Sequence, residues 1–135
     1  MNKPIESFES QEQLNECLKW WQEKLFLTDW IIIAYICEPD DFSVEGRCGE
    51  NCMSFENKGC KIKILDKKFF GKRIERYCAE KILVHELLHC KYNYLVSDGS
   101  YASVYLDVME HQQLEQMAKS LIMVKYGLDF DYFRG

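Results

Sequence analysis

The decapeptide Glu-Lys-Ile-Leu-Val-His-Glu-Leu-Leu-His, residues 80–89, ends in the pentapeptide HExxH, and its apolar positions recur with the period of an α-helix. The pattern extends from residue 73 to about residue 94 and predicts one long helix. Residues four apart lie on the same face of a helix, so His85 and His89 can present two imidazoles to one metal ion. Glu86 lies about a hundred degrees further round the helix. It can therefore accept a proton from a water molecule bound to that ion.

The third metal ligand is expected from a later element, because three positions on one helix cannot surround an ion. The segment 103–126 has its own apolar stripe and predicts a further helix, with Gly127 as its C-cap. Extending this stripe backwards brings Glu110 and His111 near the side that faces the core, with Glu110 slightly closer to its centre. Both suit zinc, which lowers the pKa of a bound water to near neutrality and polarises a carbonyl group. The residue of this pair that does not bind the ion is expected to hold a ligand imidazole.

The residues before the HExxH segment predict one helix and three strands. Ser10 has the spacing of a capping box and begins a helix predicted over about 10–26. The β-branched run 30–37 predicts a central strand, and 52–56 and 60–65 predict a hairpin. Strands early and helices late favour the α+β class. We expect a small, mostly antiparallel sheet packed on the HExxH helix, with two further helices.

Composition limits the classes of protein that need to be considered. A chain of 135 residues predicts a single domain over 1–135, and 47% hydrophobic residues are typical of a globular protein. The net charge of −5 disfavours a dedicated nucleic-acid binder. The longest apolar run is too short to cross a bilayer, and the N-terminus lacks the apolar core of a signal peptide. These features predict a cytoplasmic protein that does not bind a membrane.

Two segments carry weaker signals. Seven cysteines without a CxxC pair predict reduced thiols; Cys48, Cys52 and Cys60 form one local cluster, but their spacing is not that of a zinc ribbon. The segment 67–73 interleaves basic and aromatic residues, which is compatible with contact to a nucleic-acid backbone but more often marks a solvated turn.

Two stretches together resemble a known family. Residues 80–89, followed by Glu-His-Gln-Gln-Leu-Glu-Gln-Met-Ala-Lys-Ser-Leu at 110–121, resemble the small HExxH metallopeptidases of phages and mobile elements. They are also similar to the ImmA-type peptidases, which cleave repressors. The resemblance covers the C-terminal part of the chain and, before it, only the order of the elements. It implies a minimal zincin, with strands packed on the HExxH helix and substrate along an edge strand, for which 60–65 is the candidate.

The resemblance also bears on the third ligand. In that wider group the ligand is typically a glutamate, seven residues before an alanine that follows an apolar residue. Laid on Met117 and Ala118, this register falls on His111 rather than on Glu110. The residue type departs from the family pattern, so both candidates stay open.

The leading interpretation is a zinc-dependent metallopeptidase that acts on a protein or peptide substrate. His85 and His89 are the predicted ligands, His111 or Glu110 the third, and Glu86 the general base. A deformylase-like amidase is disfavoured because that family's glycine-rich and cysteine-ligand motifs are not found. Two alternatives remain: a DNA-associated Spartan-type protease, which also pairs HExxH with a later histidine, and a metal-bound, non-catalytic interaction domain. The intact Glu86 argues against the last.

A zincin also needs a donor that stabilises the tetrahedral oxyanion. Four tyrosines lie near enough to the motif in sequence: Tyr92, Tyr94, Tyr101 and Tyr105. Nothing in the pattern selects among them, and aromatic packing is the more common role for each.

Overall fold

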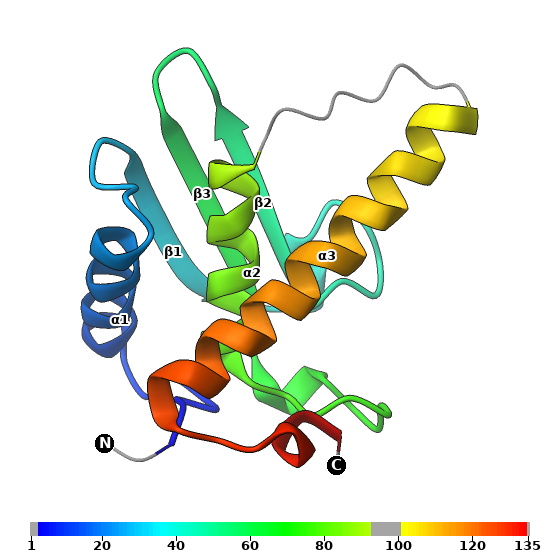
Figure 1. The fold of residues 1–135 in the computed structure, drawn as a ribbon. Helices are drawn as coiled ribbons and strands as arrows, with labels where there is room; N and C mark the ends of the chain where they lie inside the picture. The colour runs from blue at the N-terminus through cyan, green and yellow to red at the C-terminus, as the bar shows by residue number, and fades with distance from the viewer. Residues whose placement is uncertain (1–2, 93–100, 135) are drawn as a thin grey trace.

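The computed structural model describes residues 3–92 and 101–134, with the backbone alone for 101–107. Within these residues the chain forms an α+β domain, as predicted (Figure 1). The elements in chain order are α1 (Gln11–Lys24), β1 (Ile31–Cys37), η1 (Pro39–Asp41), β2 (Gly49–Ser54), β3 (Gly59–Leu65), η2 (Lys67–Phe69), α2 (Ala79–Lys91), α3 (Tyr101–Tyr126) and η3 (Phe130–Arg134), where η marks a short 3-10 helix.

The three strands form a mixed sheet in the order β1-β3-β2. β3 pairs antiparallel with β2 and parallel with β1. The prediction of a mostly antiparallel sheet is therefore wrong for half of the pairings. The reason is the connection between β1 and β3, which passes through β2 on the far side of β3 and so returns the chain in the direction of β1. Such a crossover connection is what parallel pairing requires.

The predicted positions of two strands are also wrong. β1 is an edge strand rather than the central one, and β3 is central rather than an edge. The continuous apolar run of β1 was misleading because Ile31 and Ile33 lie exposed on the face opposite α2. The alternation of apolar and charged residues in β3 suggested an edge strand, although β3 is central. Its isoleucines Ile62 and Ile64 are fully buried under α2, while Lys61 projects from the uncovered face of the same central strand.

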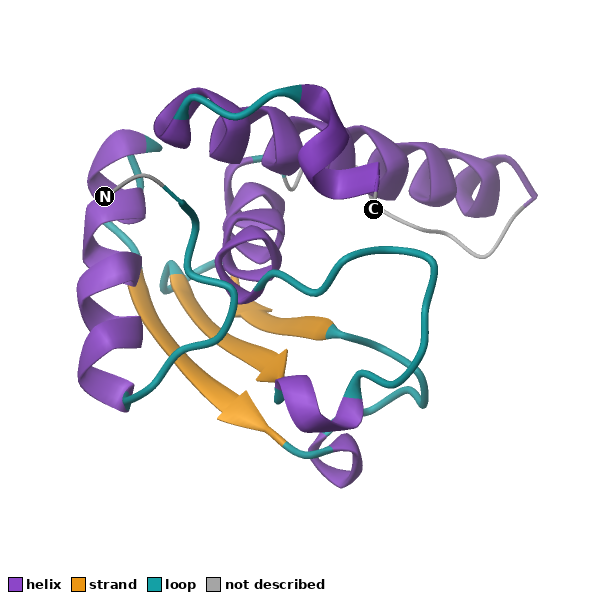
Figure 2. Ribbon diagram, turned by 90° about the horizontal axis from the view of Figure 1, so that it is seen from below, coloured by secondary structure: helices purple, strands orange, loops and turns teal. Residues whose placement is uncertain are grey.

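Helix α2 is the centre of the domain. One side packs on β2 and β3, and α3 crosses its other side, while α1 lies beside β1 at the edge of the sheet (Figures 1 and 2). Because α2 is enclosed by these layers, most of its side chains are buried, including charged ones. The buried residues of α2 are Ala79, Glu80, Lys81, Ile82, Leu83, Val84, Glu86, Leu87, Leu88 and Cys90.

Helix α2 begins at Ala79, six residues later than the periodicity predicts. The backbone N–H groups of Ala79 and Glu80 donate to the carbonyls of Glu6 and Ile5, both at 3.0 Å, so the N-terminal segment caps the helix. Ile74, an apolar position inside the predicted helix, is fully exposed in the preceding loop. The apolar residues before Ala79 therefore belong to an irregular segment and not to a helix.

The buried carboxylate of Glu80 joins this helix start to the rest of the fold. It accepts hydrogen bonds from Trp21 Nε1 (2.8 Å) on α1 and from Lys125 Nζ (2.7 Å) and the Tyr126 hydroxyl (2.6 Å) on α3. The backbone N–H of Ile5 donates to it as well, at 2.9 Å. Burial opposes ionisation, but these four bonds hold the pKa of Glu80 below its usual value. The HExxH helix is therefore anchored firmly at its first turn.

Two predicted helix ends are confirmed. The Ser10 hydroxyl accepts from the Gln13 N–H at 3.0 Å and caps α1. α3 ends at Tyr126, and Gly127 follows it with a φ of +63°, a conformation that glycine adopts without strain.

Candidate metal centre

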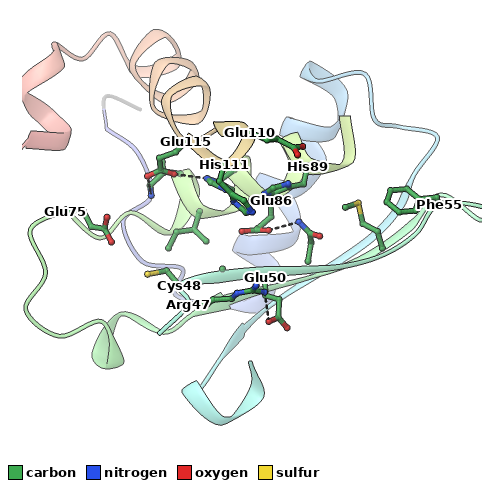
Figure 3. A pocket seen from close by; sticks show the side chains of 16 residues that line it. Arg47, Cys48, Glu50, Phe55, Glu75, Glu86, His89, Glu110, His111 and Glu115 are labelled. Atoms are coloured by element: carbon green, nitrogen blue, oxygen red, sulfur yellow. Dashed lines mark hydrogen bonds and ion pairs between the residues drawn. The ribbon is translucent and has the colours of Figure 1, made fainter. Parts of the chain in front are cut away.

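Three imidazoles converge between α2 and α3. His85 and His89 lie one turn apart on α2, and His111 comes from the facing side of α3 (Figure 3). One potential ligand atom from each residue lies within 4.8 Å of the other two. The ring centroids are 5.1 Å apart for His85 and His89, 5.8 Å for His85 and His111, and 4.7 Å for His89 and His111. In the part of the chain that the structure describes, no other group of His, Cys, Asp or Glu side chains is arranged in this way.

The donor set of this cluster fits a metal ion such as zinc. A metal ligand must offer a lone pair, so each imidazole must be neutral. Burial, with the neighbouring imidazoles of His85 and His111, lowers the pKa of His89 to about 3. Three imidazoles can hold Zn²⁺ and leave a fourth position open. Other divalent transition metals also accept imidazole ligands, so the cluster by itself does not select the metal.

A carboxylate that the sequence reasoning did not single out orients one of these histidines. Glu115 Oε1 lies 2.8 Å from His85 Nδ1, and its Oε2 lies 2.8 Å from Lys81 Nζ. Because an ionised carboxylate only accepts, Nδ1 of His85 carries the proton and its Nε2 keeps the lone pair. Burial opposes ionisation, but the hydrogen bond from His85 and the charge of Lys81 lower the pKa of Glu115 to about 2. Glu115 lies four residues after His111 on the same face of the helix, and this spacing could have identified it from the sequence.

Glu110, the other candidate for the third ligand, has a different position. It lines the same cavity as the histidines and is half-buried. Its carboxylate is not part of the converging group of ligand atoms, which His111 completes. The geometry therefore favours His111 over Glu110 as the third ligand.

The carboxylate of Glu86, the predicted base, is buried beside the histidines and is held from β2. Asn51 Nδ2 donates to Glu86 Oε1 at 2.7 Å. The other oxygen, Oε2, lies against Gly49, where a Cβ atom would come within 2.8 Å of it and within 2.7 Å of Ile82 Cγ2. Burial raises the pKa of Glu86, opposed by the charge of His85 and by the Asn51 hydrogen bond. Neither Gly49 nor Asn51 stood out in the sequence, because the strand was predicted to begin at residue 52, whereas β2 begins at Gly49.

A cavity of about 570 Å³ opens in front of Glu86 and the three histidines. β2 forms one wall of this cavity and α3 the opposite wall (Figure 3). Residues 71–78, which precede α2, contribute Glu75 at one end, and Phe55 lies at the other (Figure 3). The side chains of the candidate centre are therefore accessible to a molecule much larger than water.

The backbone of β2 has a free edge at this cavity. The Leu65 N–H donates to the Cys48 carbonyl at 2.8 Å, and the antiparallel register then bonds every second residue of β2 to β3. Asn51 and Met53 occupy the alternate positions, so their N–H and C=O groups point away from β3. Among the described residues no strand pairs with β2 on that side. Polar backbone groups are thus presented beside Glu86.

The three clustered cysteines and the basic segment 67–73 do not form a second candidate site in the described part of the chain. Cys48 lines the cavity and accepts from Arg73 at 2.8 Å, whereas Cys52 is exposed and Cys60 is buried. Of the basic segment 67–73, Arg73 is engaged by this contact and by the Phe70 carbonyl at 3.0 Å.

Of the four tyrosines considered as oxyanion donors, Tyr92 is half-buried against the core. Tyr94 and the side chains of Tyr101 and Tyr105 lie outside the described residues. The sequence favoured aromatic packing for each of the four, and the contact of Tyr92 with the core agrees with that preference.

Comparison with known proteins gives no relative. No protein-family model matches the chain, and neither a curated protein nor a solved structure matches it. No helix in residues 3–92 or 101–134 combines the length and the apolar character needed to cross a membrane.

Proposed function

We propose that this protein is a zinc-dependent metallopeptidase that hydrolyses peptide bonds in a protein or peptide substrate. One observation carries the proposal: the potential ligand atoms of His85, His89 and His111 converge within 4.8 Å, and the buried carboxylate of Glu86 lies beside them. Three protein ligands with one open position are typical of catalytic zinc, whereas structural zinc is usually enclosed by four. The open cavity supports the same interpretation.

The roles of the residues follow from their contacts. Zinc held by the three imidazoles would acidify a coordinated water and polarise the carbonyl of the substrate. Glu86 accepts the proton of the attacking water and delivers it to the leaving amine. Asn51 holds one oxygen of Glu86 at 2.7 Å and so fixes the direction of the other. Glu115 keeps His85 in the tautomer and orientation that a metal ligand needs.

The free edge of β2 supports an extended peptide as the substrate. A peptide can add to an exposed edge as a further strand through backbone hydrogen bonds, which requires no particular side chains. The outward groups of Asn51 and Met53 would bind it beside Glu86. In the family that the sequence resembles, substrate lies along an edge strand. The predicted segment 60–65 belongs to the central strand β3, and the edge strand beside Glu86 is β2.

The proposal is tested by metal analysis together with peptide cleavage. Protein purified without chelators should hold about one zinc ion per chain. It should cleave members of a diverse peptide pool, lose this activity with a chelator and regain it with zinc. Absence of any transition metal would contradict the metal site. Bound zinc without cleavage of any peptide would favour a non-catalytic, metal-bound domain.

The third ligand is tested by a matched pair of variants. His111→Ala should release zinc at concentrations at which the wild type holds it, because an imidazole ligand is removed. Glu110→Gln should keep zinc binding close to that of the wild type. Zinc titration with a competing chelator measures both. The reverse result would assign the third position to Glu110.

A DNA-associated protease of the Spartan type is the second candidate, because it also pairs HExxH with a later histidine. The cluster that His111 completes is compatible with it, but the net charge of −5 is not favourable for binding DNA. Binding to duplex DNA that weakens steeply with salt would support this candidate.

A further inference from the structure

The cavity at the candidate centre has two chemically different ends. One end carries the charged residue Glu75 (Figure 3). Phe55 lies at the other end, beyond the histidines on the opposite side from Glu75 (Figure 3), and Met53, two residues before it, lines the same cavity. A peptide bound along β2 would therefore meet the carboxylate of Glu75 on one side of the bond to be cleaved and the ring of Phe55 on the other.

The residues at the Phe55 end of the cavity continue the face of β2 from which Asn51 contacts Glu86. Side chains alternate along a strand, so Asn51 and Met53 project from β2 on the side of α2. Phe55, two residues further, lines the same cavity at the beginning of the hairpin turn. Its side chain is 57% exposed, whereas Met53 is half-buried. A large aromatic ring is thus presented to the cavity with much of its surface in water.

The α3 side of the cavity is polar, because Glu110 and His111 line it, whereas Val108, one turn before His111, does not. The apolar surface that a ligand can bury in the cavity is therefore that of Met53 and Phe55.

We propose that Met53 and Phe55 form a specificity subsite for a large apolar side chain of the substrate. The inference rests on the proposed peptidase function and adds to it the class of peptide that is cleaved. Two residues of strand span about 7 Å, so a substrate residue opposite Met53 lies two residues from the one opposite Asn51. The apolar side chain therefore belongs two or three residues from the cleaved bond, on one side only.

The first test determines the cleavage pattern in a peptide pool prepared from a digested proteome. The zinc-loaded protein should produce new ends with Leu, Ile, Met or Phe enriched at one position, two or three residues from the cut. Phe55→Lys should abolish this enrichment and favour Asp or Glu at the same position. Phe130→Lys is the matched control, because Phe130 is 63% exposed on η3 and does not line the cavity. It should retain the wild-type pattern.

The second test measures binding without turnover. The probes are short alanine peptides with a zinc-binding hydroxamate at one end or the other, and with Leu or Lys two residues from it. In one of the two polarities, zinc-loaded protein should bind the Leu probe about tenfold more tightly than the Lys probe, as partial burial of a Leu side chain predicts. Phe55→Lys should remove this preference, and Phe130→Lys should not.

The outcomes separate this inference from the proposed function. Cleavage without an apolar preference, or a preference that Phe55→Lys retains, would overturn the subsite and leave the peptidase intact. A Leu preference in hydroxamate binding without cleavage of any peptide would support the subsite and contradict the peptidase. Neither cleavage nor a Leu preference would overturn both.

Discussion

The two edge strands of the sheet, β1 and β2, differ in whether other residues cover their outward backbone groups. At the β1 edge, α1 lies alongside the strand, and its side chains bind the outward carbonyls: Gln11 Nε2 donates to Ala34 at 2.7 Å and Gln22 Nε2 to Trp30 at 3.1 Å. At the β2 edge, no described element pairs with the strand, and the outward groups of Asn51 and Met53 face a cavity. An unprotected edge invites pairing with other chains.

The two edges of the sheet cannot be distinguished by the volume of the cavity beside each. The one at β1 has a volume of about 540 Å³ and the one at β2 about 570 Å³. Amide and aliphatic side chains dominate the first, and no histidine, carboxylate or cysteine lines it. The second contains the three histidines, Glu86 and Glu115. The chemistry of the side chains, and not the available space, identifies the β2 edge as the candidate active site.

The largest effect is expected from removing the proposed base, Glu86, at the β2 edge. Glu86→Gln should keep the fold and the zinc, because the amide is nearly isosteric and Glu86 is not a proposed ligand. It should lower the rate of peptide cleavage about 10²- to 10⁴-fold, since an amide cannot accept the proton. Cleavage rates at matched zinc occupancy measure this.

The control for Glu86→Gln lies near the other edge. Glu16→Gln makes the same chemical change on an exposed position of α1 and should leave cleavage unchanged. Equal rates for Glu86→Gln and the wild type would show that another group is the base.

The next effect concerns the contact that orients His85. Glu115→Ala should weaken zinc affinity about 10- to 100-fold, because the imidazole loses the carboxylate that fixes its tautomer. The neighbouring Gln116→Ala, exposed on the same helix, should leave the affinity unchanged. Competition with a chelator of known affinity measures both. An unaltered affinity in Glu115→Ala would mean that Glu115 serves only its ion pairs with Lys81 and Lys119.

The parts of the site that the sequence predicted are those within one helix. His85, Glu86 and His89 have their relation fixed by helix geometry, so the HExxH spacing was sufficient. For His111 the apolar stripe of α3 indicated the correct side, but choosing between it and Glu110 needed the packing of α3 on α2. The local pattern thus gave the two candidate ligands on α2 and left two neighbouring residues as candidates for the third.

The parts that the sequence did not predict depend on contacts between distant residues. Asn51 and Glu86 are 35 positions apart, and His85 and Glu115 are 30 apart. Nothing local to Asn51 distinguishes it from any other polar residue in a strand. The predicted strand order was wrong for the same reason. Whether β1 or β3 is central depends on which strands each of them pairs with.

Gly49 offers a way to disturb the β2 edge without changing its chemistry. In Gly49→Ala the new Cβ would lie 2.8 Å from Glu86 Oε2 and 2.7 Å from Ile82 Cγ2, closer than unstrained contact allows. We expect a loss of about 1–3 kcal/mol in the free energy of unfolding, together with slower cleavage as Glu86 is displaced. Denaturant titration measures the first and the peptide assay the second.

Gly59→Ala is the matched control for this substitution. The nearest atom to a Cβ at Gly59 is the Ile31 carbonyl oxygen at 3.9 Å, an ordinary contact. This variant should change the free energy of unfolding by less than about 0.5 kcal/mol. Equal effects of the two substitutions would show that α2 moves away from Gly49 at little cost.

The smallest effect is expected at the protected edge. Gln11→Ala and Gln22→Ala should each lower the free energy of unfolding by about 1 kcal/mol, the usual contribution of one hydrogen bond. Cleavage should not change, since neither residue lines the cavity at β2. Gln113→Ala, exposed on α3, is the control. The double variant should also aggregate faster below its unfolding transition, because the backbone of β1 then loses the amides that cover it. If light scattering shows no difference from the control, the helix alone protects this edge, and the contrast with β2 rests on α1 rather than on the glutamine amides.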